Sequence, residues 1–355
     1  MSALLPVAVF GAGHMGRHHV RLYSQMPGVR LAAVIDANVE RARALAEPLG
    51  ARFADRWSAE LCDLAAASVA VPTVRHLEVA QPLIERGVAV LIEKPLAPDT
   101  RQAEAIAALA RRHDAIVQVG HTERFNPAVQ AVKRLGVRPR FIETQRISPF
   151  TFRSADVGVV FDMMIHDIDI LTHLVGEEVE RIDAVGVAVL GRHEDVANVR
   201  VECRGGAVAN LTASRLALKT ERKLRVFCED AYLSLDYQKK IGVAITKDRN
   251  LDVLKIARER NLEDLSQLAG LDFGKMIHVE PLTVEAGDAL QTELDVFIET
   301  VRRRRNGDAP RADSSTAESA AAPGRATPAS VEDGVSAVRI AERIVAAIQT
   351  HRWER

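Results

Sequence analysis

The chain has 355 residues, of which 47% are apolar and 27% charged, and its 47 basic and 48 acidic side chains leave a net charge of −1. This length predicts about two domains, and the composition excludes wholesale disorder, a collagen-like chain and a disulfide scaffold. The charge balance gives no general attraction to nucleic acid or to an anionic membrane surface, so we expect neither as a partner.

The first third of the chain alternates short apolar runs with amphipathic stretches. The apolar runs are 6–10, 31–35, 68–71, 88–92 and 115–119, and the segments of helical period include 41–49, 76–86 and 102–113. Near-continuous apolar strands separated by helices are typical of a parallel sheet that is covered on both faces. Residues 1–122 are therefore predicted to form a doubly wound α/β domain.

The pattern changes after His121. A helical stretch at 126–135, a strand at 141–147 and a helical segment at 161–175 precede strand candidates at 181–190, 196–203, 207–216, 223–228 and 232–237, and 290–305 is again helical. Short strands joined by turns predict a largely antiparallel sheet. We expect residues 123–306 to form an α+β domain that binds substrate and supports oligomerisation.

The C-terminal part combines an aperiodic segment with a helix. Residues 307–330 are rich in Ala, Ser and Pro, which predicts a flexible linker. Ser330 and Asp333 resemble a capping box, and the apolar stripe that follows predicts a helix over 331–355.

The cysteines and the apolar runs bear on location. Cys62, Cys203 and Cys228 are odd in number and widely spaced, which argues against a disulfide framework or a zinc cage. No apolar run approaches the ~18 residues of a membrane span, and the N-terminus shows no cleavable leader. We expect a cytoplasmic protein without membrane insertion.

A glycine-rich motif follows the first apolar strand and opens a helix. Its sequence is Gly11-Ala12-Gly13-His14-Met15-Gly16, which fits G-x-G-x-x-G. Gly11 permits a tight turn, Gly13 allows a pyrophosphate to approach, and Gly16 allows close helix packing. His14 and Met15 begin the helix, whose N-terminus offers N–H donors to phosphates.

Asp36 ends the next strand, twenty residues after Gly16. Its carboxylate can accept hydrogen bonds from both hydroxyls of a ribose, and Ala37-Asn38 provides no arginine for a 2′-phosphate. The pattern therefore predicts NAD as the cofactor instead of NADP. The alternative is a structural glycine turn beside a solvated aspartate.

Further polar motifs follow the later strands. Glu93, Lys94 and Pro95 come directly after the strand at 88–92, at the carboxyl edge where ligands of open α/β sheets bind. The preceding strand is followed by Pro72, Thr73 and His76, and the second half contains Gly158, Asp162 and His166 in the spacing G-x3-D-x3-H.

Together these motifs resemble the Gfo/Idh/MocA family, the glucose-fructose oxidoreductase and inositol dehydrogenase type. The resemblance extends from Val7 to about Asp169, and the segment Gly120-His121-Thr122-Glu123-Arg124-Phe125-Asn126-Pro127 is similar to the sugar-nucleotide branch. That branch includes the UDP-N-acetylglucosamine 3-dehydrogenases that supply an amino sugar for lipid A. The resemblance implies a homo-oligomer, a dimer or tetramer, that pairs through the open face of its antiparallel sheet. It also implies cofactor contacts from Pro72, Thr73, His76, Glu93 and Lys94.

Three residues carry the expected chemistry. Oxidation of a secondary alcohol needs a hydride acceptor, a base for the hydroxyl proton and a donor near the developing alkoxide. His166 suits the base, Asp162 one helical turn earlier can orient it, and Lys94 can donate to the substrate oxygen. The family resemblance implies the same three roles.

Other interpretations stay open for some of these residues. Asp162, His166, Asp169 and His173 also fit a plain polar helix face or a metal site by their helical spacing; we predict no metal. Arg124 and Asn126 are candidates for substrate contact, although Arg124 could equally form a structural ion pair.

We therefore predict an NAD-dependent dehydrogenase acting on CH–OH groups, with a small nucleotide sugar as its partner. The resemblance implies oxidation of UDP-N-acetylglucosamine to the 3-oxo sugar. One alternative is a dehydrogenase of a free sugar, a polyol or another nucleotide sugar. A second is a non-catalytic NAD sensor, which would not need Lys94, Asp162 and His166.

Overall fold

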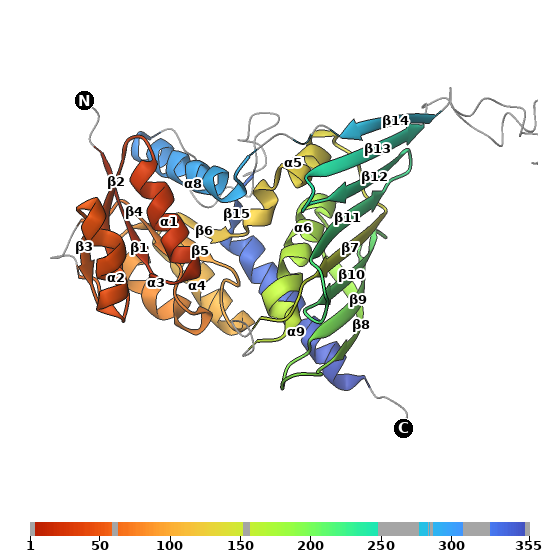
Figure 1. Cartoon of the computed structure of the whole chain (residues 1–355), viewed down its shortest axis with the longest axis horizontal. Helices are drawn as coiled ribbons and strands as arrows, with labels where there is room; N and C mark the ends of the chain where they lie inside the picture. Colours follow the sequence, from red (N-terminus) through yellow and green to blue (C-terminus); the bar gives the residue numbers. More distant parts are fainter. Residues whose placement is uncertain are drawn as a thin grey trace, which may run out of the picture. The chain divides into compact units, whose positions relative to one another are not determined.

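The computed structural model describes residues 4–58, 63–151, 157–247, 277–282, 284, 287–307 and 327–351. The chain forms two compact units (Figure 1). The first comprises Met1–Asn126, Val160–Ile170 and Gly287–Arg355, and the second comprises Pro127–Val159 and Leu171–Ala286. Cys62 and most of the predicted flexible segment, residues 308–326, lie outside the described residues.

The first unit is built on a sheet whose described strands run in the order β15-β6-β5-β4-β1-β2-β3. Their bounds are β1 Leu5–Phe10, β2 Val29–Ile35, β3 Arg52–Ala54, β4 Ala66–Val69, β5 Ala89–Glu93, β6 Val117–Gly120 and β15 Ala329–Ser330. All neighbours pair in parallel except β15, which is antiparallel to β6. The carboxyl ends of β1, β2, β4, β5 and β6 therefore share one edge.

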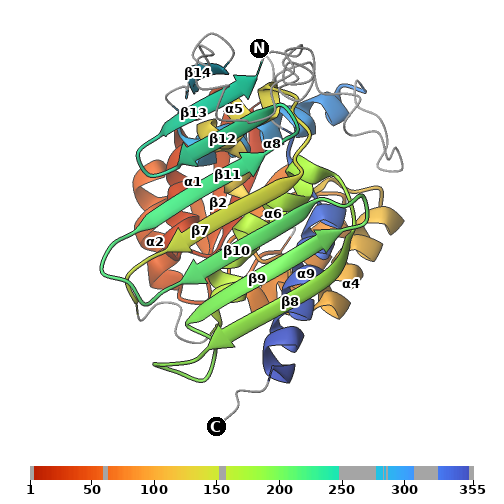
Figure 2. The same ribbon diagram turned by 90° about the vertical axis from the view of Figure 1, so that its right-hand side faces the viewer.

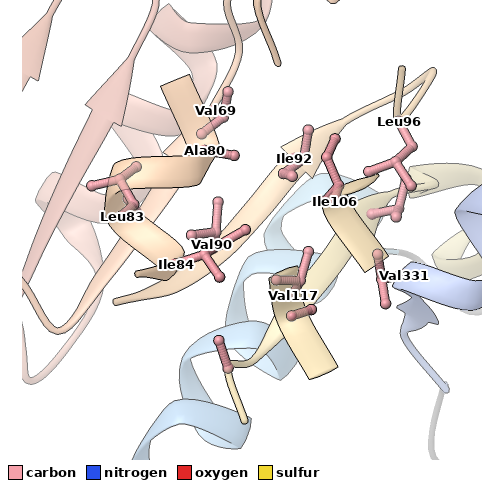
Figure 3. Close-up of a cluster of buried hydrophobic side chains, with 14 of the residues drawn as sticks. Val69, Ala80, Leu83, Ile84, Val90, Ile92, Leu96, Ile106, Val117 and Val331 are labelled. Atoms are coloured by element: carbon pink, nitrogen blue, oxygen red, sulfur yellow. The ribbon is translucent and has the colours of Figure 1, made fainter. Parts of the chain in front are cut away.

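Helices of this unit cover both faces of the sheet. They are α1 His14–Gln25, α2 Val39–Ala46, α3 His76–Ile84, α4 Thr100–Arg112, α8 Ala289–Arg305 and α9 Val331–Thr350, with the short helices η1 Glu47–Leu49, η2 Thr73–Arg75 and η3 Thr122–Phe125. One apolar cluster joins the sheet to α1, α2 and α8. The other joins it to α3, α4 and α9, and includes Leu83, Val90, Ile106 and Val331 (Figure 3). The predicted capping box of Ser330 and Asp333 is present at the start of α9.

The second unit contains a sheet whose described strands run in the order β14-β13-β12-β11-β7-β10-β9-β8. The bounds are β7 Phe141–Ile147, β8 Val179–Val187, β9 Val196–Cys203, β10 Val208–Ser214, β11 Glu221–Phe227, β12 Ala231–Asp236, β13 Ile241–Lys247 and β14 Ile277–Leu282. Neighbours are antiparallel except β7 and β10. Figure 2 looks onto one face of this sheet. The unit also contains α5 Pro127–Arg134 and the end of α6 Ile165–Val175.

The predicted fold class, a doubly wound parallel sheet followed by an α+β unit with a largely antiparallel sheet, is confirmed. The grouping of residues differs from the predicted boundaries, because 160–170 and α8 belong to the first unit although 123–306 was expected to form one domain. Four apolar side chains explain the position of α8, since Leu294, Phe297, Ile298 and Val301 are buried with α1 against the first sheet. No described helix is long and apolar enough to cross a membrane.

Candidate active site

The glycine loop between β1 and α1 has the geometry expected of a phosphate cradle. Gly11 has a φ of +100°, and a Cβ there would overlap the carbonyl oxygen of Ala70, while a Cβ on Gly16 would overlap that of Gly11. Gly13 is different, because a Cβ on it would have no protein atom within 4 Å. Gly13 precedes α1 as its N-cap without a side-chain hydrogen bond, so the open space beside it would let a pyrophosphate reach the N–H groups at the start of α1.

Asp36 connects the end of β2 to this loop. Its Oδ2 accepts a hydrogen bond from the Ala12 N–H at 2.6 Å, and its Oδ1 accepts one from the Asn38 N–H at 2.8 Å. The half-buried carboxylate is therefore held beside the glycine loop, where an NAD ribose would lie. His14 is exposed at the start of α1, and its Nδ1 lies 2.9 Å from an Arg17 guanidinium nitrogen. The residues around the loop fit NAD.

His76 lies beneath the loop that follows β4. Its ring is buried, with Nε2 at 3.0 Å from the Val71 carbonyl oxygen and Nδ1 at 3.2 Å from that of Leu96. Burial is the main cause that lowers the pKa of His76, and a neutral ring donates to one carbonyl at a time. His76 was predicted to contact the cofactor, but its buried ring connects the loops that follow β4 and β5. Of the other two residues predicted after β4, Pro72 is exposed and Thr73 is half-buried.

Lys94 and Asp162 meet within the first unit. The Lys94 ammonium donates a hydrogen bond to the Asp162 carbonyl oxygen at 2.7 Å and lies 3.6 Å from the Asp162 Oδ1. Both side chains keep some exposure, 21% for Lys94 and 28% for Asp162. A charged donor and a carboxylate therefore lie together beyond the end of β5.

The helix that carries Asp162 departs from the predicted one. Residues Val160–Met164 form a π-helical turn, η5, and α6 begins only at Ile165, so Asp162 and His166 do not share one regular α-helix. The carboxylate that was expected to orient His166 has Lys94 as its ionic partner. His166 is half-buried at the second position of α6. Single π-helical turns are frequent at functional sites, because the extra residue redirects side chains.

Arg124 forms a buried ion pair. Its Nε donates to both carboxylate oxygens of Asp169, at 3.0 and 2.8 Å, and its Nη2 donates to Oδ1 at 2.7 Å, while Nη1 donates to Oδ2 of Asp333 at 3.2 Å. The guanidinium is only 2% exposed. Burial by itself would lower the pKa of Arg124, but the Asp169 and Asp333 carboxylates raise it above its ordinary value. This arrangement corresponds to the structural ion pair and joins η3 to α6 and α9.

The remaining candidates are distributed around this ion pair. Asn126 is half-buried, and its amide donates to Oε2 of Glu123 at 2.9 Å. The Asp169 carboxylate accepts hydrogen bonds from Arg124, and His173 belongs to the second unit. Among the described residues, no group of three His, Cys, Asp or Glu side chains is arranged to hold a metal ion.

The buried side chains behind the edge include residues that the motifs did not single out as functional. The Glu93 carboxylate, predicted to contact the cofactor, is buried, and its Oε1 lies 2.9 Å from Nε2 of His19. Glu293 on α8 accepts a hydrogen bond from the Thr122 hydroxyl at 2.8 Å. The α8 residue lies 171 positions from its partner, so no local pattern could have indicated the contact.

The chain matches two sequence models of one family. Residues 5–121 match the model described as "Oxidoreductase family, NAD-binding Rossmann fold", and residues 136–234 match the GFO/IDH/MocA C-terminal domain.

Individual relatives agree with this match. A UDP-N-acetylglucosamine 3-dehydrogenase of Acidithiobacillus ferrooxidans is 38% identical over 230 residues, which cover 64% of this chain and 73% of the relative. A solved structure of such an enzyme from that organism has a TM-score of 0.79 at 29% identity, with 98% of each chain covered. Myo-inositol dehydrogenase Hyg17 of Streptomyces leeuwenhoekii is 32% identical over 198 residues, covering 52% of this chain and 60% of Hyg17.

Proposed function

Since the chain belongs to the Gfo/Idh/MocA family of NAD-binding oxidoreductases, we propose that it oxidises the 3-hydroxyl of UDP-N-acetylglucosamine to a ketone. Relatives of this chain are named as a UDP-N-acetylglucosamine 3-dehydrogenase and inositol 2-dehydrogenases, and residues 5–121 match an NAD-binding oxidoreductase model, so the predictions of an enzyme and of NAD as cofactor are confirmed. The 38% identity to a UDP-N-acetylglucosamine 3-dehydrogenase is the observation that supports the finer assignment.

The chemistry is divided among three side chains. Bound NAD supplies the hydride acceptor. Lys94 donates a hydrogen bond to the substrate oxygen and stabilises its negative charge, and His166 removes the hydroxyl proton. Asp162, whose Oδ1 lies 3.6 Å from the Lys94 ammonium, holds that side chain at the edge of the sheet by ion pairing.

We propose further roles for the surrounding residues. Gly11, Gly13 and Gly16 bind the pyrophosphate with the N-terminal residues His14 and Met15, and Asp36 binds the ribose. Pro72 and Thr73 contact the cofactor at the neighbouring strand end. Asn126 contacts the substrate, whereas Arg124 supports the site from within.

The product and the assembly complete the proposal. A 3-oxo sugar is a substrate for amino transfer, which places this reaction in amino-sugar synthesis of the kind that supplies lipid A.

The chain forms a homo-oligomer, a dimer or tetramer, through the face of the second sheet on which the rings of Phe141, Phe227 and Tyr232 contact one another.

A substrate panel tests the assignment. The purified protein is incubated with NAD and each of UDP-N-acetylglucosamine, other nucleotide sugars, free sugars and inositols, and the absorbance of reduced nicotinamide is followed. We expect the highest kcat/KM with UDP-N-acetylglucosamine and unchanged turnover after exhaustive chelation. A preference for an inositol would instead favour the activity named for Hyg17, and NAD binding without any turnover would favour a sensor.

A further inference from the structure

Three ionisable side chains meet in the interior behind the last residue of β5. His19 on α1 and Glu293 on α8 are 0% and 1% exposed, and Glu93 is 7% exposed. Nε2 of His19 lies 2.9 Å from Oε1 of Glu93, and the Thr122 hydroxyl donates to Oε2 of Glu293 at 2.8 Å. The proposed reaction gives His19 and Glu293 no role, although both lie directly behind the edge that carries Lys94.

The contacts of Glu293 suit a neutral acid. Its Oε2 accepts from Thr122, but its Oε1 has no hydrogen-bond partner among the described residues. A buried carboxylate oxygen without a donor is costly, whereas the O–H of a carboxylic acid can donate to an acceptor. The Glu93 carboxylate is close enough to act electrostatically on Glu293 and is the acceptor we infer.

Electrostatics agree with that protonation state. Burial, and after it the charge of Glu93, raises the pKa of Glu293 well above its ordinary value. Two carboxyl groups in one buried site cannot both ionise at low cost. Among the described residues, the charged or titratable groups that act on Glu293 are Glu93 on β5, Tyr23 on α1, Arg124 on η3 and Asp169 on α6, and His19 on α1 is bonded to Glu93.

The cluster of His19, Glu93 and Glu293 is connected to Lys94 through the backbone at the end of β5. Glu93 pairs with Gly120 of β6, and a Cβ on Gly120 would lie only 3.1 Å from the Glu93 carboxyl carbon. The Glu93 side chain is thus packed against β6 on one side and bonded to His19 on the other. Because Lys94 follows Glu93 directly, any shift of Glu93 moves the Lys94 backbone.

We propose that His19, Glu93 and Glu293 are positioning residues for Lys94, with Glu293 carrying a proton that it donates toward the Glu93 carboxylate. The neutral acid lets both carboxyl groups stay buried, and the hydrogen-bonded cluster holds the end of β5 in place. The positioning part rests on the role proposed for Lys94. The protonation of Glu293 does not.

Infrared spectroscopy tests the protonation without any substrate. We expect the wild-type protein at neutral pH to show the carbonyl band of a buried carboxylic acid, and Glu293→Gln to lack it. Glu299→Gln, an exposed residue on the same helix, is the matched control and should keep the band. Absence of the band in the wild-type protein would mean that Glu293 is ionised and would overturn the proposal, whatever the substrate of the enzyme.

The pH dependence of unfolding gives a second readout. A carboxyl group whose pKa is raised in the folded state contributes stability that is complete below its unfolded pKa of about 4.3 and is lost as the pH rises toward the folded pKa. The amide that replaces this carboxyl group in Glu293→Gln cannot ionise, so the midpoint difference between the variant and wild type should grow in favour of the variant from about pH 5 to about pH 8. A constant difference over that range would contradict a neutral Glu293.

Kinetics test the positioning role. Glu93→Gln should lower kcat about 10- to 100-fold, the scale of a misplaced catalytic group, and shift the pH profile of kcat, with NAD affinity within a few-fold of wild type. Glu293→Leu, which removes the hydrogen bonds of this side chain, should lower kcat in the same direction. Glu293→Gln should show a smaller loss, since the amide can donate to Glu93 and accept from Thr122. If Glu93→Gln lowered the unfolding midpoint but left kcat and its pH profile unchanged, the cluster would stabilise the fold without positioning Lys94, and the proposal would be wrong.

Discussion

The two halves of the carboxyl edge of the first sheet are built in different ways. At β1 and β2 the Asp36 carboxylate is bonded by the backbone N–H groups of Ala12 and Asn38, the first 24 residues away. At β5 and β6 the contacts join side chains to distant segments: Lys94 meets Asp162 over 68 residues, and Arg124 meets Asp333 over 209.

This difference teaches which kind of change each half tolerates. The β1–β2 half, called the nucleotide half because we propose that NAD binds there, depends on backbone geometry and on the open space beside Gly13, so substitutions there should alter ligand binding. The β5–β6 half, called the catalytic half because we propose that Lys94 acts there, depends on charges from β5, η3, η5, α6 and α9, so substitutions there should alter turnover or folding. The predictions below separate these effects.

The largest effect is expected from the catalytic half. Lys94→Met should lower turnover by about 10²- to 10⁴-fold, because it removes the donor to the substrate oxygen, and His166→Ala should act in the same direction. NAD affinity, measured by calorimetry, should stay within a few-fold. Lys219→Met, at an exposed lysine of the second unit, is the control. Equal losses of NAD binding and turnover would mean that the two halves are not separable.

A large loss of stability is expected at the buried ion pair. Arg124→Met leaves Asp169 and part of Asp333 without their cation, which should reduce the free energy of unfolding by about 3–5 kcal/mol. Arg225→Met removes an exposed pair with Glu143 and should cost less than about 1 kcal/mol. Denaturant unfolding monitored by circular dichroism compares the two. If Arg124→Met unfolded like wild type but bound substrate poorly, Arg124 would be a substrate ligand.

The smallest effect is expected in the nucleotide half. Asp36→Asn should narrow the preference for NAD over NADP by about tenfold, since it removes the repulsion of a 2′-phosphate while keeping an acceptor for the Ala12 N–H. Dissociation constants for both cofactors measure this, with Asp183→Asn, an exposed aspartate of the second unit, as control. Tighter binding of NADP by the wild-type protein would refute the role of Asp36.

Much of the nucleotide half could be predicted from the sequence alone. Apolar runs identified β1, β2, β4, β5 and β6, and the glycine spacing with Asp36 identified the loop, because these features depend on neighbours in the chain and on backbone conformation. The three-residue strand β3 and the two-residue strand β15 were missed, since segments this short carry no period. Strands β13 and β14 at one edge of the second sheet were also not predicted.

Only the tertiary structure decided how the motif residues are used. The motifs pointed to Glu93, Asp162 and Arg124 but not to their partners. In the structure the Glu93 side chain is buried against His19, and Asp162, on a π-helical turn, pairs with Lys94. Arg124 pairs with Asp169 and Asp333. Buried charges take whichever partner the packing of distant helices brings within about 3–4 Å. Those partners follow from how α6, α8 and α9 bury their apolar faces, which local patterns do not specify.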